Sequence, residues 1–293
     1  MFANAIQKTG EFTRPILTIS RFFGSTQVNP GTATLFFVNE NGDAVTCRHV
    51  AKLVMDAERI NRRYEDFKKK RSEHPENAEK LAAQYGYNST VLAEMRHNFV
   101  DTVDHFQTLQ CVFHPKHDLA LIRMGGFTRT LYRGHAVFAK DDHGIQPGDF
   151  LCRLGFPFPE FSGYFYDAKE DRIGFDPKGR LITPRFPSEG MFTRHLGGDN
   201  GEMIGYELST PGLPGQSGGP LFNKEGIVYG MQYETKHLPI HFNTPGNDQK
   251  LYLNVGHCLS AGIIKKFLSD HGVRYYTEED LERDNAPRVY KIC

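Results

Sequence analysis

One short segment combines a nucleophilic side chain with the residues that can expose it. In residues 211–221, Pro-Gly-Leu-Pro-Gly-Gln-Ser-Gly-Gly-Pro-Leu, a serine stands between glycines and prolines bracket the whole. Glycines let the backbone adopt a strained turn that presents the hydroxyl and directs amide N–H groups at one point. The N–H groups of Gly215 and Ser217, with Gln216 as a third candidate, could hold the oxyanion of an acyl-transfer intermediate. A plain glycine-rich turn between two strands is the alternative.

A histidine that could activate this serine follows a predicted hairpin. Residues 32–38 are rich in β-formers and stop at Asn39-Glu-Asn-Gly42, a strong signal for a tight turn. A second short strand, residues 44–47, leads directly to His49. A histidine chosen blindly from the 13 in this chain is more often a surface or core residue than a base. The position of His49 just after the hairpin is what makes it the candidate.

An acidic candidate stands at the start of a later strand. Residues 106–113 have strand character, and Asp118 directly precedes the apolar run Leu-Ala-Leu-Ile. The alternative is an ordinary turn aspartate that caps a strand. Asp101 and Asp104 are weaker candidates because no apolar strand follows either of them directly.

A helical module separates the histidine from the aspartate. Apolar residues recur at spacings of three and four between Leu53 and Phe67, which predicts a helix with a buried stripe. Pro75 ends or interrupts that helix, and residues 76–85 predict a second one. We therefore expect a helical insertion over about residues 53–100, which packs by its stripe on the first β unit or on a partner chain.

The rest of the chain predicts a second β unit. Gly125-Gly126 marks the break, and residues 146–158 contain the strand that opens the new unit. Residues 159–205 have no clear period and are expected to form a hairpin with long loops. Later strands are predicted at residues 226–233 and 250–255, followed by a closing helix at 260–268 with Ser260 as its N-cap.

Three motifs occur in the chain order of one known family. The Gly-Gln-Ser-Gly-Gly-Pro-Leu segment around Ser217 resembles the nucleophile loop of the chymotrypsin-like (trypsin-fold) serine proteases. The Thr-x-x-His-Val segment at His49 resembles the histidine region of the HtrA-like bacterial branch, and the strand at Asp118 resembles the aspartate segment of the family. The resemblance covers roughly residues 15–50 and 106–268.

This resemblance implies a mainly β fold with two antiparallel six-stranded β-barrels, a helical insertion in the first barrel and a C-terminal helix. The first barrel would span residues 1–130 and carry His49 and Asp118, and the second would span residues 131–293 and carry Ser217. It also implies a serine endopeptidase, in which the histidine deprotonates the serine and the aspartate fixes the imidazole tautomer. Only about 20 residues follow the closing helix, too few for the PDZ domain of HtrA proteins.

Two other functions stay open. The G-x-S-x-G pattern also fits the nucleophile elbow of an α/β-hydrolase esterase, which needs an acid and then a histidine after the serine. The downstream pairs are Asp248 with His257 and Asp270 with His271, but no alternation of strands and helices accompanies them. A catalytically silent trypsin-fold binding module is the second alternative, and labelling of Ser217 by an organophosphonate would separate the classes.

The resemblance also places a substrate pocket between the segment before the serine and the strand after it. Its floor and walls would come from Pro211, Gly212 and Leu213 on one side and Met231, Gln232 and Tyr233 on the other. None of these residues carries a charge, so we expect cleavage after small or medium apolar residues such as Val, Ala or Leu. If the Glu234 side chain turned into the pocket, a basic residue could be accepted instead.

Composition narrows the class of protein and its partners. Hydrophobic residues make up 39% and charged residues 24% of the 293, as in ordinary globular proteins. The 35 basic residues equal the 35 acidic ones, so nothing favours a nucleic-acid or membrane partner. The expected partners are protein or peptide substrates, with a homo-oligomer or a partner bound through the insertion left open.

Cysteine usage and the lack of long apolar runs predict the compartment. The five cysteines are odd in number and scattered, which favours free thiols in a reducing compartment over a zinc site or a disulfide framework. No run approaches the ~18–20 apolar residues of a membrane span, and no signal segment is seen. We expect a cytoplasmic protein with no metal and no cofactor. The cysteines are Cys47, Cys111, Cys152, Cys258 and Cys293.

Overall fold

The first of two large sheets contains the predicted hairpin. The computed structural model describes residues 1–240 and 251–285, and its first sheet has six antiparallel strands in the order β4-β1-β2-β3-β6-β5. The strands are β1 (Thr13–Phe22), β2 (Asn29–Phe37), β3 (Asp43–Thr46), β4 (Leu92–Phe99), β5 (Thr108–Phe113) and β6 (Ala120–Gly125). Fully buried apolar side chains from β2, β3 and β6, including Leu35, Val45 and Leu121, fill its core.

The second sheet closes on itself. Six antiparallel strands form a ring because β13 pairs with both β8 and β14, while β7 and β16 add to one edge as parallel strands. Its strands are β7 (Val137–Phe138), β8 (Phe150–Gly155), β11 (Phe186–Gly197), β12 (Met203–Leu208), β13 (Pro220–Phe222), β14 (Val228–Ile240), β15 (Leu251–Ser260) and β16 (Tyr276–Thr277). The predicted mainly β fold is confirmed, with one closed six-stranded barrel and one six-stranded sheet in which β4 and β5 are not paired with each other. Both six-stranded units are antiparallel, unlike the parallel sheet of an α/β-hydrolase.

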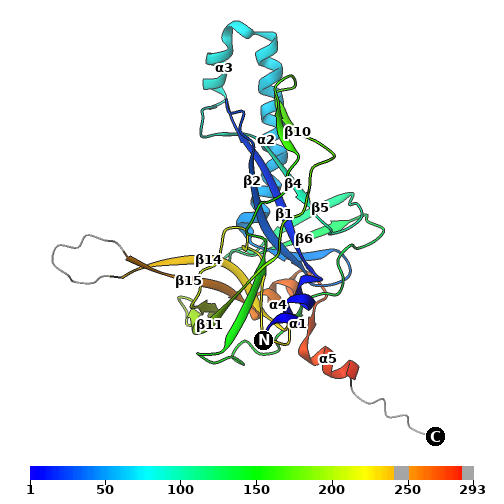
Figure 1. Ribbon diagram of the computed structural model, residues 1–293, viewed down its shortest axis with the longest axis vertical. Helices are drawn as coiled ribbons and strands as arrows, with labels where there is room; N and C mark the ends of the chain where they lie inside the picture. Colours follow the sequence, from blue (N-terminus) through cyan, green and yellow to red (C-terminus); the bar gives the residue numbers. More distant parts are fainter. Residues whose placement is uncertain (241–250, 286–293) are drawn as a thin grey trace, which may run out of the picture.

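The helices lie around these barrels. Figure 1 shows α2 and α3 projecting at one end of the molecule, with α1, α4 and α5 near the other. The helices are α1 (Ala3–Gly10), α2 (Arg48–Glu73), the 3₁₀ turn η1 (Pro75–Asn77), α3 (Ala78–Gln84), α4 (Ala261–Asp270) and α5 (Glu278–Asn285). As predicted, the Ser260 side chain caps the closing helix α4 by accepting from the N–H of Ile263. No helix in the described residues is both long and apolar enough to cross a membrane.

The division of the chain at residue 130 stays a prediction, and the contacts of the first helix do not follow this division. Phe2 directly precedes α1 and Ala5 lies in it. Both pack in one cluster with Leu154 and Phe222 of the second barrel. The N-terminal residues therefore belong by contact to the second barrel, although the following strand β1 belongs to the first.

The insertion differs from its predicted bounds and face. The helix α2 begins at Arg48, directly after β3, so His49 lies in its first turn rather than at a strand end. The predicted helical insertion over residues 53–100 is wrong at its end, because β4 is a barrel strand paired with β1. Tyr64 and Phe67 are buried as predicted, but Leu53 of the predicted stripe is 42% exposed.

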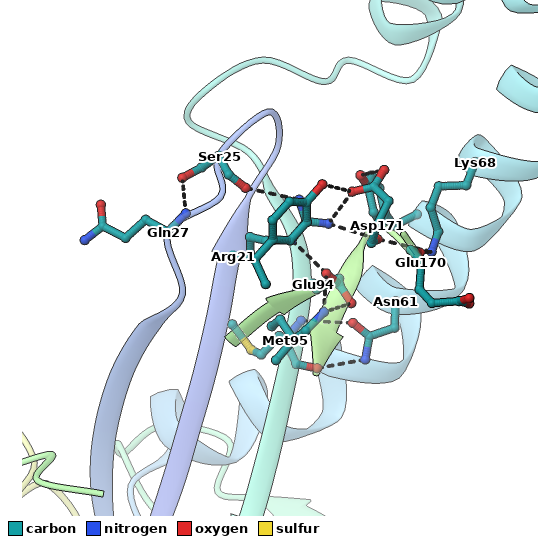
Figure 2. A network of polar contacts seen from close by, with 12 residues as sticks. Arg21, Ser25, Gln27, Asn61, Lys68, Glu94, Met95, Glu170 and Asp171 are labelled. Carbon is teal, nitrogen blue, oxygen red and sulfur yellow. Dashed lines mark hydrogen bonds and ion pairs between the residues drawn. The ribbon is translucent and has the colours of Figure 1, made fainter. Parts of the chain in front are cut away.

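A buried ionic network holds the insertion to the rest of the fold. Arg21 of β1, only 1% exposed, lies between Glu94 of β4, at 2.8 Å, and Asp171, at 3.1 Å. Asp171 sits in the turn of a hairpin made by β9 (Tyr164–Asp167) and β10 (Arg172–Phe175). It also accepts hydrogen bonds from Tyr64 and Arg71 of α2. Figure 2 shows this network between the helix, the hairpin and the strands.

The acid at the centre of this network is held ionised. Burial alone would raise the pKa of Asp171, but the hydrogen bonds from Arg71 and Tyr64 outweigh burial and lower it below the ordinary value. The carboxylate therefore stabilises the fold above the pKa that it has in the unfolded chain, and this contribution is lost as the pH falls through the lower folded-state pKa.

We expect Asp171→Ala to lower the free energy of unfolding by about 2–3 kcal/mol at neutral pH, because it leaves the buried Arg21 cation short of an acid. Thermal or urea unfolding measures the effect, with the exposed neighbour Glu170→Ala as the matched control. The difference between wild type and Asp171→Ala should shrink in acid. Equal stability of Asp171→Ala and Glu170→Ala at neutral pH would contradict a stabilising role of the Asp171 network.

Candidate active site

The predicted base and acid lie side by side. His49 Nδ1 is 2.7 Å from Asp118 Oδ2, and the backbone N–H of His49 donates to Asp118 Oδ1 at 2.9 Å. One carboxylate thus holds both the imidazole ring and the first turn of α2. Burial alone would raise the pKa of Asp118, but the hydrogen bonds from His49 outweigh burial and lower it below the ordinary value. An ionised carboxylate only accepts, so Nδ1 carries the proton and Nε2 is left as the basic nitrogen.

The serine loop is pressed against the end of β3. Thr34 of β2 donates its N–H to the carbonyl of Ser217 at 3.0 Å. A Cβ on Gly218 would lie 2.1 Å from the Thr34 carbonyl and 2.3 Å from the Thr46 hydroxyl, so only glycine permits this approach. Since Thr46 is three residues before His49, these contacts bring the serine to the start of α2. In the described chain the His49 ring bonds to Asp118 and not to the Ser217 hydroxyl.

The backbone of the serine loop leaves two donors available. Gly215 and Gly218 both have positive φ, +91° and +87°, which glycine adopts at little cost. Within the described residues, the N–H groups of Gly215 and Ser217, two of the predicted oxyanion donors, donate to no acceptor of the chain. The third candidate was wrong: the N–H of Gln216 donates to Leu213 at 2.9 Å, and the Gln216 side chain is buried.

Three potential metal-ligand atoms meet at this point. The ligand atoms of Cys47, His49 and Asp118 all lie within 4.8 Å of one another. The Cys47 thiol is fully buried and donates to the carbonyl of Gln232, and burial raises its pKa well above the ordinary value. A metal needs a thiolate, which this environment disfavours. The group is better explained as the base and acid beside a buried structural thiol.

The cysteines found free give a prediction about redox conditions. Cys47, Cys111, Cys152 and Cys258 are all unpaired thiols. We expect dithiothreitol to leave both the activity and the melting temperature unchanged, because a native disulfide is typically worth about 2–4 kcal/mol and none joins these four. Melting curves with and without reductant test this, and a drop of several degrees in reductant would contradict it. The fifth predicted free thiol, Cys293, lies outside the described residues.

The predicted pocket residues come together only in part. Met231 is fully buried and its side chain packs in the first hydrophobic core rather than against the other predicted pocket residues. The Gln232 side chain is 2% exposed and lies against Gly212, where a Cβ would be 2.3 Å from Nε2. The Thr235 hydroxyl also donates to the Gly212 carbonyl at 2.8 Å. The two predicted walls are thus in contact through Gln232 and Gly212.

The other predicted pocket residues are at least partly exposed. Pro211 is exposed, whereas Leu213 and Tyr233 are half-buried. Burial raises the pKa of Tyr233 to about 12, so its hydroxyl is neutral. The Glu234 carboxylate lies 2.7 Å from the Lys236 ammonium, which gives it a partner outside the pocket. Its other oxygen lies 3.8 Å from His257 Nδ1, and the alternative that Glu234 accepts a basic residue stays a prediction.

The sequence analysis missed one side chain at this place. Arg153 of β8 is fully buried and donates to Gln232 Oε1 at 3.0 Å and to the hydroxyl of Thr210. The available signal was a lone basic residue in the otherwise largely apolar strand Phe150–Gly155.

Comparison with known proteins agrees with this geometry. A family model described as a trypsin-like peptidase domain matches residues 31–231, well over half of the chain. The chain therefore belongs to the trypsin-like peptidase domain family. No curated protein matches it. Among solved structures it is similar to the HtrA-type protease AlgW determined with a tripeptide, at 14% identity and a TM-score of 0.46. The match covers 93% of this chain, which spans 65% of that protein's length.

Proposed function

We propose that this protein is a serine endopeptidase that uses Ser217, His49 and Asp118 as its catalytic triad. The observation that carries this proposal is the hydrogen-bonded His49–Asp118 pair, placed where the loop presenting Ser217 meets the end of β3. Membership of the trypsin-like peptidase family supports it. The missing serine–histidine hydrogen bond is compatible with it, because such bonds are often long or misaligned until substrate binds.

In this proposal, each step of peptide hydrolysis is carried out by a named residue. His49 Nε2 takes the proton of Ser217 as its Oγ attacks the scissile carbonyl, and the oxyanion accepts from the N–H groups of Gly215 and Ser217. The C–N bond breaks as His49 returns the proton to the leaving amine, which leaves an acyl-enzyme. Water, deprotonated by the same histidine, then hydrolyses the ester. Asp118 holds the tautomer and stabilises the imidazolium throughout.

The wider context of this activity is also a proposal. Protein or peptide chains are the substrates that a peptidase site would accept. The free thiols favour a reducing compartment, for which we propose the cytoplasm. Because α2 carries His49 in its first turn and projects at one end of the molecule (Figure 1), the insertion is our candidate contact for a partner or a second copy.

A fluorophosphonate probe tests the proposal without knowledge of the substrate. We expect wild-type protein to be labelled at Ser217, as mapped by mass spectrometry, and His49→Ala to react at least a hundredfold more slowly. Ser89→Ala, at an exposed serine of the insertion, serves as the matched control and should label like wild type. Folded wild-type protein that resists the probe would favour the silent binding module.

A further inference from the structure

The interior of the second barrel contains a buried cation with neutral partners. The Arg153 side chain is fully buried, and its Nη1 and Nη2 donate to the amide oxygen of Gln232 and the hydroxyl of Thr210. Its Nε finds no partner among the described residues. A Cβ on Gly256 would lie 2.1 Å from Nη1, so β15 passes directly over the guanidinium. Only a residue without a Cβ therefore fits at position 256 beside this cation.

No acid in the described part of the chain forms an ion pair with this cation. Burial lowers the pKa of Arg153, yet a guanidinium stays protonated in proteins. Glu207 of β12 pairs with Arg194, Glu234 of β14 pairs with Lys236, and Glu189 of the adjacent strand β11 is exposed and forms no ion pair with Arg153. Buried charges in proteins are normally paired. An arginine left in this state is ready to accept a carboxylate from outside the chain.

The guanidinium lies one side chain away from the nucleophile loop. The backbone N–H of Gly218, next to the serine, donates to the carbonyl of Gln232 at 2.9 Å, and the Gln232 N–H donates to Gly219 at 2.9 Å. The side chain of the same Gln232 accepts from Arg153. The second partner, Thr210, directly precedes the segment that begins with Pro211. One predicted pocket wall therefore contacts this cation through Gln232, and the other begins directly after its second partner, Thr210.

We propose that Arg153 is the specificity-determining residue of the substrate pocket and that it selects an acidic residue, glutamate above all, before the cleaved bond. The inference rests on the proposed function, since it identifies the substrate class of that site. A carboxylate bound by a guanidinium makes charge-assisted, commonly bidentate hydrogen bonds. A glutamate reaches deeper than an aspartate toward a cation that is fully buried. This replaces the apolar pocket expected from the uncharged residues at 211–213.

The Gln232 side chain holds the place of the substrate. Its Oε1 accepts a hydrogen bond from Nη1 of Arg153, as a carboxylate oxygen would. Its Nε2 donates to the carbonyl of Glu234. A substrate carboxylate would take over the hydrogen bond that this amide oxygen now accepts. A neutral amide keeps the guanidinium hydrogen-bonded between turnovers without neutralising its charge, so an acid still gains by replacing it.

The test uses peptide phosphonate probes that differ only in the side chain before the reactive phosphorus. We expect the full-length protein to be labelled at Ser217 more than about tenfold faster by the glutamate probe than by the glutamine probe, its neutral isostere, or by leucine and arginine probes. Ser217→Ala sets the background. Glutamate and glutamine probes of equal rate, or a faster leucine or arginine probe, would overturn the inference while leaving the proposed function intact.

A second variant separates recognition by Arg153 from a purely structural role. Arg153→Gln is expected to lose the preference for glutamate over glutamine, measured as the ratio of the two labelling rates, with its melting curve recorded beside it. A folded Arg153→Gln that keeps the glutamate preference would refute the assignment. If that variant does not fold, the wild-type probe series decides alone. Failure of every probe and of the small fluorophosphonate to label Ser217 would refute the proposed function and this inference together.

Discussion

Ser217→Ala is expected to reduce peptide hydrolysis by about 10⁴–10⁶-fold. The reason is that its hydroxyl forms the covalent bond of the acyl-enzyme, and no neighbouring group can replace it: the nearby Cys47 thiol is fully buried and its raised pKa keeps it protonated. The melting temperature should hardly change, because the hydroxyl makes no hydrogen bond within the described residues. Initial rates with a fluorogenic peptide measure the effect.

The control for this variant is Ser89→Ala, which removes an exposed hydroxyl in the insertion. It should cleave the same peptide at the wild-type rate. If Ser217→Ala retained more than a few per cent of wild-type activity in a preparation free of contaminating peptidases, the nucleophile would have to be sought elsewhere.

Asp118→Asn is expected to lower kcat by about 10⁴-fold while the fold is kept. The carboxylate receives two bonds from His49, one from the ring and one from the backbone N–H. An asparagine oxygen can still accept from the backbone N–H that begins α2, which turns its NH₂ group toward Nδ1. That NH₂ forces the ring proton onto Nε2, where it blocks the proton transfer from serine. The structure therefore predicts a catalytic defect without a large loss of stability.

Two comparisons check this interpretation of Asp118. Asp118→Ala removes both hydrogen bonds, so it should melt at a lower temperature than Asp118→Asn as well as lose activity. Asp199→Asn, at an exposed aspartate, removes a charge of the same kind and should leave the rate unchanged. If Asp118→Asn kept a tenth or more of wild-type kcat, the aspartate would not be fixing the tautomer.

The strands that sequence analysis predicts best are those with apolar runs and turn residues at their ends. The hairpin of β2 and β3 and the helix α4 are of this kind. The strand β4 escaped because it reads Leu-Ala-Glu-Met-Arg-His-Asn-Phe, with an acid at Glu94 that looks exposed. That acid is buried in the folded chain beside Arg21, 73 positions away in the sequence, and it also accepts from the N–H of Ile173. Local patterns contain no information about such a distant partner.

The residues of the candidate site also fall into two groups, those that a local motif predicts and those that depend on distant contacts. The predicted triad residues are recognisable because each stands in a local motif, and the structure brings His49 and Asp118 into contact. Arg153 has no motif of its own, and its significance depends on which strands surround it. Gln216 was misjudged because sequence cannot show which amide of a turn is already hydrogen-bonded.

The length of α2 has a mechanical consequence. This helix of 26 residues contains His49 in its first turn, and from His49 to Arg71 it extends roughly 33 Å at 1.5 Å per residue. Asp118 pins the near end of this rod, and Asp171 pins the far end. A rod fixed at both ends cannot tilt, so the aim of the imidazole depends on an anchor far outside the cleft. We therefore expect that loss of the distal contact between Arg71 and Asp171 would disturb the orientation of the His49 ring without any change in the residues around that ring.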